Sequence, residues 1–151
     1  MSICVNKNRD IFEKFIKISE NDILKEKLDF PLTHSLIVAK NKNGFLLMYN
    51  TWKKKWELAG GIIDNNETIR ECVKRELLEE TNQIAENLEF IGLMKFKLKT
   101  GKTEYGGLFK GKITKERQFI NNNESEKIIF WNGIDNIGYI DEIDKKLLEY
   151  Y

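Results

Sequence analysis

Three glutamates, Glu76, Glu79 and Glu80, lie close together in a segment with the pattern of an amphipathic helix. Residues three and four positions apart lie on the same side of a helix, so these carboxylates converge. At about 100° per residue, Glu76 and Glu80 fall in the middle of the apolar face and Glu79 falls at its edge. The apolar residues of that face are Ile69, Cys72, Val73 and Leu77.

A buried carboxylate without a partner costs several kcal/mol, so a positive charge is expected beside these glutamates. Acid-rich helices are usually just solvated, but here the acids share the apolar face. Arg75 can pair with Glu79 or Glu71, yet one arginine cannot neutralise three carboxylates. A cluster of oxygen ligands suits a hard cation, Mg²⁺ with Mn²⁺ as a substitute, rather than zinc.

The ends of this helix are also encoded locally. Thr68-x-x-Glu71 is a capping-box pattern, which makes Thr68 the expected N-cap. Asn82 tolerates the left-handed conformation that ends many helices, so the helix is predicted from about Thr68 to Thr81.

The segment from Gly61 to Gln83 resembles the Nudix box, whose pattern is Gly, five residues, Glu, seven residues, then Arg-Glu-aliphatic-x-Glu-Glu-x-Gly-aliphatic. Here the matching residues are Gly61, Glu67 and the run Arg75-Glu76-Leu77-Leu78-Glu79-Glu80. Asn82 and Gln83 depart from the final Gly and aliphatic positions, and Ala59 replaces a proline that often precedes the two glycines.

The resemblance implies a magnesium-dependent hydrolase that cuts a pyrophosphate bond in a nucleoside diphosphate linked to another group. The MutT-like group, which hydrolyses nucleoside triphosphates and oxidised forms such as 8-oxo-dGTP, is the leading interpretation because the chain is small. ADP-ribose, a dinucleoside polyphosphate and capped RNA are alternative substrates. A third hypothesis is a non-catalytic Nudix-fold regulator that binds a nucleotide, although all the carboxylates of the box are present.

The resemblance also assigns roles to residues of the box. Glu79 and Glu80 resemble the main metal ligands, and Glu76 resembles a further ligand or the general base. The main-chain carbonyl of Gly60 resembles another ligand. Arg75 is expected to orient the carboxylates, and Glu67 to fix the preceding loop through Arg75.

Two further segments are candidates for the site. Some Nudix enzymes take an additional carboxylate from a later loop, for which Glu124 and Glu126 are the candidates; a solvated acidic loop is the alternative. The loop at positions 52–56 places three lysines between two tryptophans, so its lysines could bind phosphates and a tryptophan could stack on a base. The candidate substrate-binding residues are Trp52, Lys53, Lys54 and Lys55, and the alternative is a solvated loop with Trp56 buried.

The elements that must position these residues alternate between helices and strands. Apolar spacing from Ile11 to Leu28 predicts one or two N-terminal helices. Strands are predicted over 32–40, 44–49, 56–58, from 88, over 104–113 and over 128–131, and a last helix over 140–150. Asn43-Gly44 predicts a hairpin between the first two strands. The class is α/β in the α+β sense, and the resemblance implies a mixed sheet between helices with a loop-helix-loop motif.

Length and composition favour one compact domain, with an N-terminal helical extension over 1–30 and a Nudix domain over 31–151. The net charge of +1 gives no indication of a nucleic-acid partner or a membrane surface. Cys4 and Cys72 are far apart, and residues 1–10 lack the pattern of a secretory signal, so we expect a cytoplasmic protein. The expected partner is the nucleotide substrate, and the protein is a monomer or homodimer.

Overall fold

Strand β3 (Leu32–Asn41) is the centre of a mixed sheet in this computed structural model, which describes residues 1–23, 25 and 27–151. It pairs in parallel with β8 (Thr103–Lys112) and antiparallel with β6 (Ala59–Ile62) and β4 (Gly44–Asn50). In the described part of the chain the sheet has nine strands in the order β1-β2-β7-β8-β3-β4-β5, with β6 paired to β3 and β9 to β4. The remaining strands are β1 (Cys4–Val5), β2 (Ile11–Ile16), β5 (Lys55–Glu57), β7 (Glu86–Lys97) and β9 (Ser125–Trp131).

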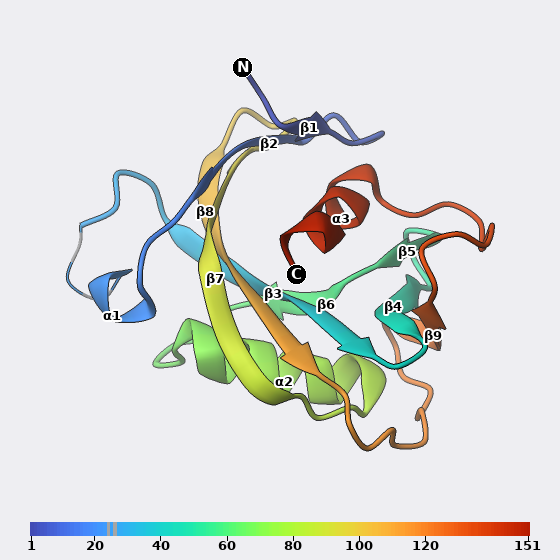
Figure 1. Ribbon diagram of the computed structural model, residues 1–151. Coiled ribbons are helices and arrows are strands. Elements are labelled where there is room, and N and C mark those ends of the chain that lie inside the picture. Colours follow the sequence, from blue (N-terminus) through green and yellow to red (C-terminus); the bar gives the residue numbers. More distant parts are fainter. Residues whose placement is uncertain (24, 26) are drawn as a thin grey trace.

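Helices cover both faces of this sheet, with α2 (Ile69–Thr81) on one side and α3 (Glu142–Leu147) on the other (Figure 1). Successive residues of a strand point to opposite faces, and β3 divides its side chains accordingly. Val38 packs in the cluster that contains α3, whereas Ile37 and Ala39 pack in the cluster that contains α2. The predicted class, a mixed sheet between helices, is confirmed.

Helix α2 begins and ends as its sequence predicts. The side chain of Thr68 accepts from the Glu71 N–H, and the Glu71 side chain accepts from the Thr68 N–H. Asn82 has a φ of 57° and its N–H bonds the carbonyl of Leu78. The helix therefore starts at a defined residue, which fixes where its glutamates point.

The predicted N-terminal helices are mostly wrong. Residues Ile11–Ile16 form β2, which pairs antiparallel with β7, and the helix α1 covers only Glu20–Ile23. A register shift between Phe12 and Lys14 lets Phe12 and Phe15 pack against the same core, although they are three residues apart. A spacing of three residues is also typical of a helix, which is why the pattern wrongly predicted one here. Leu24, part of the same prediction, lies outside the described residues.

The other elements follow the sequence prediction more closely. β3 and β4 form the hairpin expected at Asn43-Gly44, and the last predicted helix is α3 followed by a short 3-10 turn, Leu148–Tyr150. The alternation from Leu88 onward is β7, in which Met94 and Phe96 are buried. Among the described residues, no helix has the length and apolar character needed to span a membrane.

Candidate metal centre and active site

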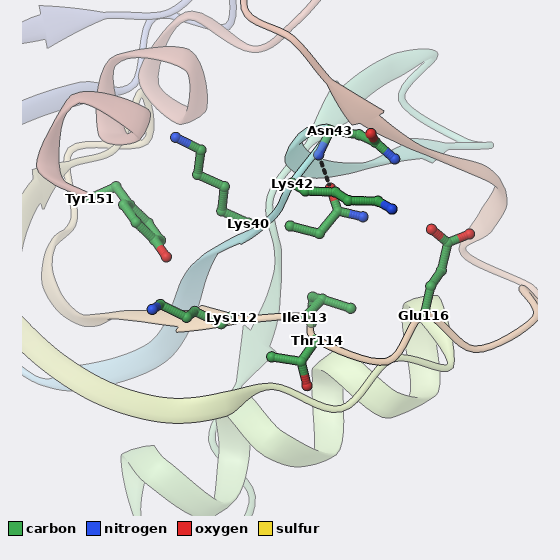
Figure 2. Close-up of a pocket in the computed structure, with 9 residues that line it drawn as sticks. Lys40, Lys42, Asn43, Lys112, Ile113, Thr114, Glu116 and Tyr151 are labelled. Carbon is green, nitrogen blue, oxygen red and sulfur yellow. Dashed lines mark hydrogen bonds between the residues drawn. The ribbon is translucent and has the colours of Figure 1, made fainter.

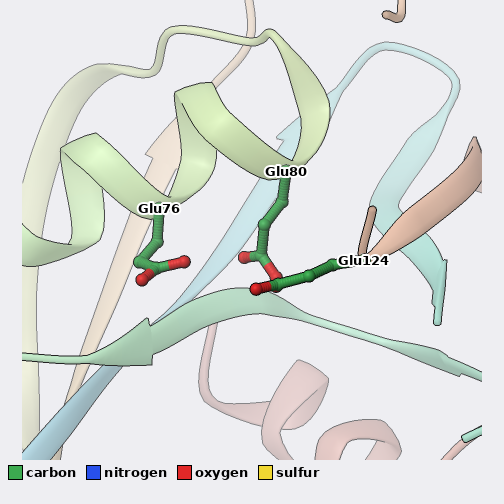
Figure 3. Close-up of side chains that lie close together, drawn as sticks. All are labelled: Glu76, Glu80 and Glu124. Carbon is green, nitrogen blue, oxygen red and sulfur yellow. The ribbon is translucent and has the colours of Figure 1, made fainter. Parts of the chain in front are cut away.

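Three carboxylates converge beside β6. Glu76 and Glu80 project from one side of α2, and Glu124 reaches toward them from the residue before β9 (Figure 3). One oxygen from each lies within 4.8 Å of the others. Glu80 is only 4% exposed, and one of its oxygens accepts the Gly60 N–H at 2.8 Å.

The charges of this cluster are poorly compensated. The pKa of Glu80 is raised to about 10, chiefly by burial and also by the neighbouring Glu124 and Glu76, while the Gly60 N–H opposes the change. Burial also raises the pKa of Glu76, against the opposing effect of Arg75. Crowded carboxylates that resist ionisation on their own are a donor set that fits a hard divalent cation.

Arg75 ties the loop before α2 to the cluster. Its guanidinium donates to both oxygens of Glu67, at 2.7 and 3.0 Å, and to Glu76 at 2.9 Å. It also donates to the Ile62 carbonyl at 3.1 Å. These bonds hold the pKa of Glu67 down at about 2, chiefly through Arg75. Arg75 therefore connects the end of β6, the following loop and the helix.

Two of the glutamates singled out from the sequence lie outside the cluster. The side chain of Glu79 is 58% exposed and pairs with Arg75 at 3.2 Å. Glu126 is exposed on β9, two residues beyond Glu124. Of the two late candidates, the structure thus places Glu124, and not Glu126, beside Glu76 and Glu80.

The loop that carries Glu124 is fastened to the last turn of α2. The Glu80 carbonyl accepts hydrogen bonds from the hydroxyl of Ser125 and from the amide of Asn122, the latter at 3.1 Å. The Trp52 indole donates to the Asn123 carbonyl at 2.8 Å, and the Thr51 N–H donates to the Glu124 carbonyl at 2.9 Å. Glu124 is therefore held in place by contacts from two other parts of the chain.

A cavity of about 560 Å³ opens beside the carboxylates. Gly60, Glu80 and Glu124 form one wall of it. Lys53 and Lys55 also line it, whereas Trp52 and Lys54 do not. The loop at 52–55 thus faces the cavity with alternate side chains only.

Lys53 and Lys55 differ in how closely they are paired with carboxylates. Lys55 is paired with Asp141 and, at 3.6 Å, with Glu57. The side chain of Lys53 is 64% exposed and lies 3.9 Å from Glu57. Lys53 is therefore the more available cation at the cavity.

Several residues of the cavity wall were not predicted from the sequence. The sole histidine, His34, lines the cavity beside Glu104, with 3.2 Å between the His34 Nδ1 and the carboxylate. Asp141 and Asp144, from the start of α3, line it as well. Asp141 is the N-cap of α3, so a capping signal just before the last helix was readable, but its position beside the cavity depends on tertiary packing.

Comparisons with known proteins agree with this architecture. A family model described as NUDIX domain matches residues 30–151. The structure is similar to that of the Bacillus subtilis pyrophosphohydrolase BsRppH, with a TM-score of 0.74 and 17% identity, over 96% of this chain and 89% of that chain. No curated protein sequence matches.

Two other solved structures also resemble this one, at similarly low sequence identity. A MutT NUDIX hydrolase from Burkholderia pseudomallei has a TM-score of 0.67 and 16% identity, over 81% of this chain and 98% of that chain. The NUDIX domain of Shewanella oneidensis NrtR, solved with ADP ribose, has a TM-score of 0.67 and 17% identity, over 88% of this chain and 96% of that chain. Structural likeness at these identities establishes a shared fold.

Proposed function

Because the chain belongs to the NUDIX domain family of hydrolases acting on pyrophosphate bonds, we propose that it hydrolyses nucleoside triphosphates, including oxidised forms such as 8-oxo-dGTP, with Mg²⁺. The observation that carries this proposal is the cluster of Glu76, Glu80 and Glu124, of which Glu80 and Glu124 line a nucleotide-sized cavity. Mn²⁺ would substitute for Mg²⁺ at the same ligands.

In this proposal the ligands are Glu76, Glu79, Glu80 and Glu124 with the main-chain carbonyl of Gly60. Bound Mg²⁺ would neutralise the charge of the pyrophosphate and acidify a water. Arg75 and Glu67 act as positioning residues, because their ion pair fixes the loop next to Glu76. Glu79 would have to turn away from Arg75 to join the ligands.

Lys53 is proposed to bind a phosphate of the substrate. Lys53 lines the cavity, whereas its neighbour Lys54 does not, so the two form a matched pair. Lys53→Gln should raise KM severalfold with little change in kcat, and less so at high salt, because an exposed charge is screened over about 8 Å. Lys54→Gln should leave both constants unchanged. Equal effects in the two variants would remove Lys53 from the binding site.

ADP-ribose is the second candidate substrate, favoured by the likeness to a NUDIX domain solved with that ligand. The test is a screen of nucleoside triphosphates, 8-oxo-dGTP, ADP-ribose, dinucleoside polyphosphates and capped RNA with Mg²⁺, detecting each product. Glu80→Gln serves as the inactive control. Hydrolysis of a triphosphate above all others is the expected result. Binding without hydrolysis of any compound would instead support a regulator.

We propose that residues 1–30 are an extension of a NUDIX domain over 31–151; their strands β1 and β2 extend the sheet edge at β7. We also propose a cytoplasmic location, which the free cysteines Cys4 and Cys72 and a nucleotide substrate support.

A further inference from the structure

A second cavity, of about 710 Å³, lies at the opposite end of β3 from His34 (Figure 2). Lys40 lies six positions after His34 along β3, which is about 20 Å of extended strand. The cavity is therefore separate from the candidate active site. Its lining residues are Lys40, Asn41, Lys42, Asn43, Lys112, Ile113, Thr114, Glu116 and Tyr151.

The register of the sheet places two lysines of this cavity side by side on neighbouring strands. Lys40 of β3 is the register partner of Lys112 of β8. Like charges on adjacent strands are destabilising. Within the described part of the chain neither lysine forms an ion pair, and neither does Lys42, whereas the nearby Lys110 pairs with Glu89 at 3.6 Å. Glu116 lines the cavity on its other side without an ion pair to these lysines, so three lysines here face one carboxylate.

The aromatic ring of Tyr151 lies close to two lysine ammonium groups. Tyr151 is 37% exposed, and the ammonium groups of Lys40 and Lys110 each lie 5.5 Å from the centre of its ring. Figure 2 shows Lys40, Lys112 and Tyr151 gathered on one side of the cavity, with Lys42 and Glu116 across from them. The cavity therefore offers both a cation pair and a partly exposed ring.

The backbone around these side chains is already fixed. The Asn41 side chain accepts the N–H groups of Asn43 and Gly44, at 2.8 and 3.1 Å, and so holds the hairpin turn. The Ile113 N–H donates to the Lys40 carbonyl at 2.9 Å, which ties the two lysine-bearing strands together. A ligand would thus meet a preformed site, and binding would require little ordering of the chain.

We propose that this cavity binds a second nucleotide, whose phosphate lies between Lys40 and Lys112 and whose base packs on the Tyr151 ring. A phosphate satisfies adjacent ammonium groups, and a base can stack on an exposed aromatic face. The lysines supply the positive charge, so this site needs no divalent cation. It would bind nucleotide independently of the carboxylate cluster.

The test is calorimetric titration of the whole protein with adenosine monophosphate in EDTA. This probe has no pyrophosphate bond, so its binding is independent of the proposed hydrolysis. Without a divalent cation, the carboxylates of the candidate active site also repel its phosphate. The double variant Lys40→Gln/Lys112→Gln should bind adenosine monophosphate at least tenfold more weakly. The melting temperature of this variant should not fall, because the substitution removes the repulsion between the two lysines. The matched control Lys102→Gln/Lys115→Gln, which removes two exposed lysines outside the cavity, should stay within twofold.

Further probes separate the two halves of the ligand. Tyr151→Ala should weaken binding of adenosine monophosphate but not of inorganic phosphate, and Tyr151→Phe should restore it. Equal binding by the double-lysine variant and its control, or equally tight binding of uncharged adenosine, would overturn the proposal. A single-stranded oligonucleotide bound more than tenfold tighter than adenosine monophosphate would also overturn it, in favour of a nucleic-acid surface.

Discussion

The Glu76 carboxyl group fills the space that a side chain at Gly61 would need. A β carbon added at Gly61 would lie 2.5 Å from the carboxyl carbon of Glu76 and 2.6 and 2.8 Å from its oxygens. The glycine of β6 therefore lets α2 bring a carboxylate directly against the strand. This close approach gives a physical reason for a glycine at this position of the box.

Gly61→Ala should displace the Glu76 carboxyl from the cluster. The side-chain end can move, so the loss of stability should be modest, about 1–3 kcal/mol. Turnover should fall much more, by at least about tenfold, since a misplaced ligand impairs the metal site. Thermal unfolding and steady-state kinetics on the same sample measure the two effects. Gly107→Ala is the control, because its β carbon would meet the side chains of Ile69 and Phe90, at 3.3 and 3.5 Å, and no carboxylate. Equal loss of turnover in both variants would mean that displacement of Glu76 is not the cause.

Stabilisation by Mg²⁺ should grow as the pH rises. The pKa of Glu80 is about 10 in the folded protein against an ordinary value of 4.5, so its proton binds more tightly in the folded state. This tighter proton binding stabilises the folded, metal-free protein. The stabilisation is fully present below pH 4.5, the ordinary pKa of a glutamate, and is lost as the pH rises toward 10. A cation binds the ionised form, so protons compete with it, by up to about tenfold in affinity per pH unit.

The measurement is the rise in melting temperature caused by Mg²⁺ at pH 6 and at pH 8.5. The rise should be larger at pH 8.5. Glu80→Gln removes the titrating group, so its metal-free form should lose less stability between these pH values and should respond little to Mg²⁺. A Mg²⁺ effect that is the same at both pH values in the wild-type protein would argue against the carboxylate site.

Ser125→Ala should loosen the loop that carries Glu124. The variant loses the bond from the Ser125 hydroxyl to the Glu80 carbonyl, a buried interaction whose loss costs about 1–3 kcal/mol. Activity at low Mg²⁺ should fall, and added Mg²⁺ should restore it in part.

Ser35→Ala is a matched control for this variant. Its hydroxyl also bonds a carbonyl of α2, that of Ile69 at 2.8 Å, but at the other end of the helix. It should lower the melting temperature to a similar extent without changing the Mg²⁺ requirement. An altered Mg²⁺ requirement in both variants would mean that helix stability, and not the Glu124 loop, is responsible.

Local sequence signals predicted α2 and the burial of Glu80 well because they depend on neighbours in the chain. The capping residues Thr68 and Asn82 set the ends of the helix, and helical geometry then placed Glu80 on the buried face. The same signals could not separate Glu124 from Glu126, since both lie near the start of the same strand. That choice is made by Asn122 and Ser125, which dock the loop on α2.

What local patterns could not predict depends on contacts between distant segments. Phe12 and Phe15 have helical spacing, but they pair with β7 as a strand with a register shift. Trp52 is a candidate for base stacking; its indole nitrogen bonds the Asn123 carbonyl, and the residue does not line the cavity. Local patterns of residues do not show which distant segments come together.

Binding of a divalent cation by Glu76, Glu80 and Glu124 can be measured without a substrate, with Mn²⁺ as the ion and electron paramagnetic resonance to follow the free ion. Glu124→Gln and Glu126→Gln remove one carboxylate each, inside and outside the cluster. Glu124→Gln should weaken Mn²⁺ binding at least about tenfold, while Glu126→Gln should stay within about twofold of the wild-type protein. Equal Mn²⁺ affinity in the two variants would show that these three carboxylates do not form the metal site.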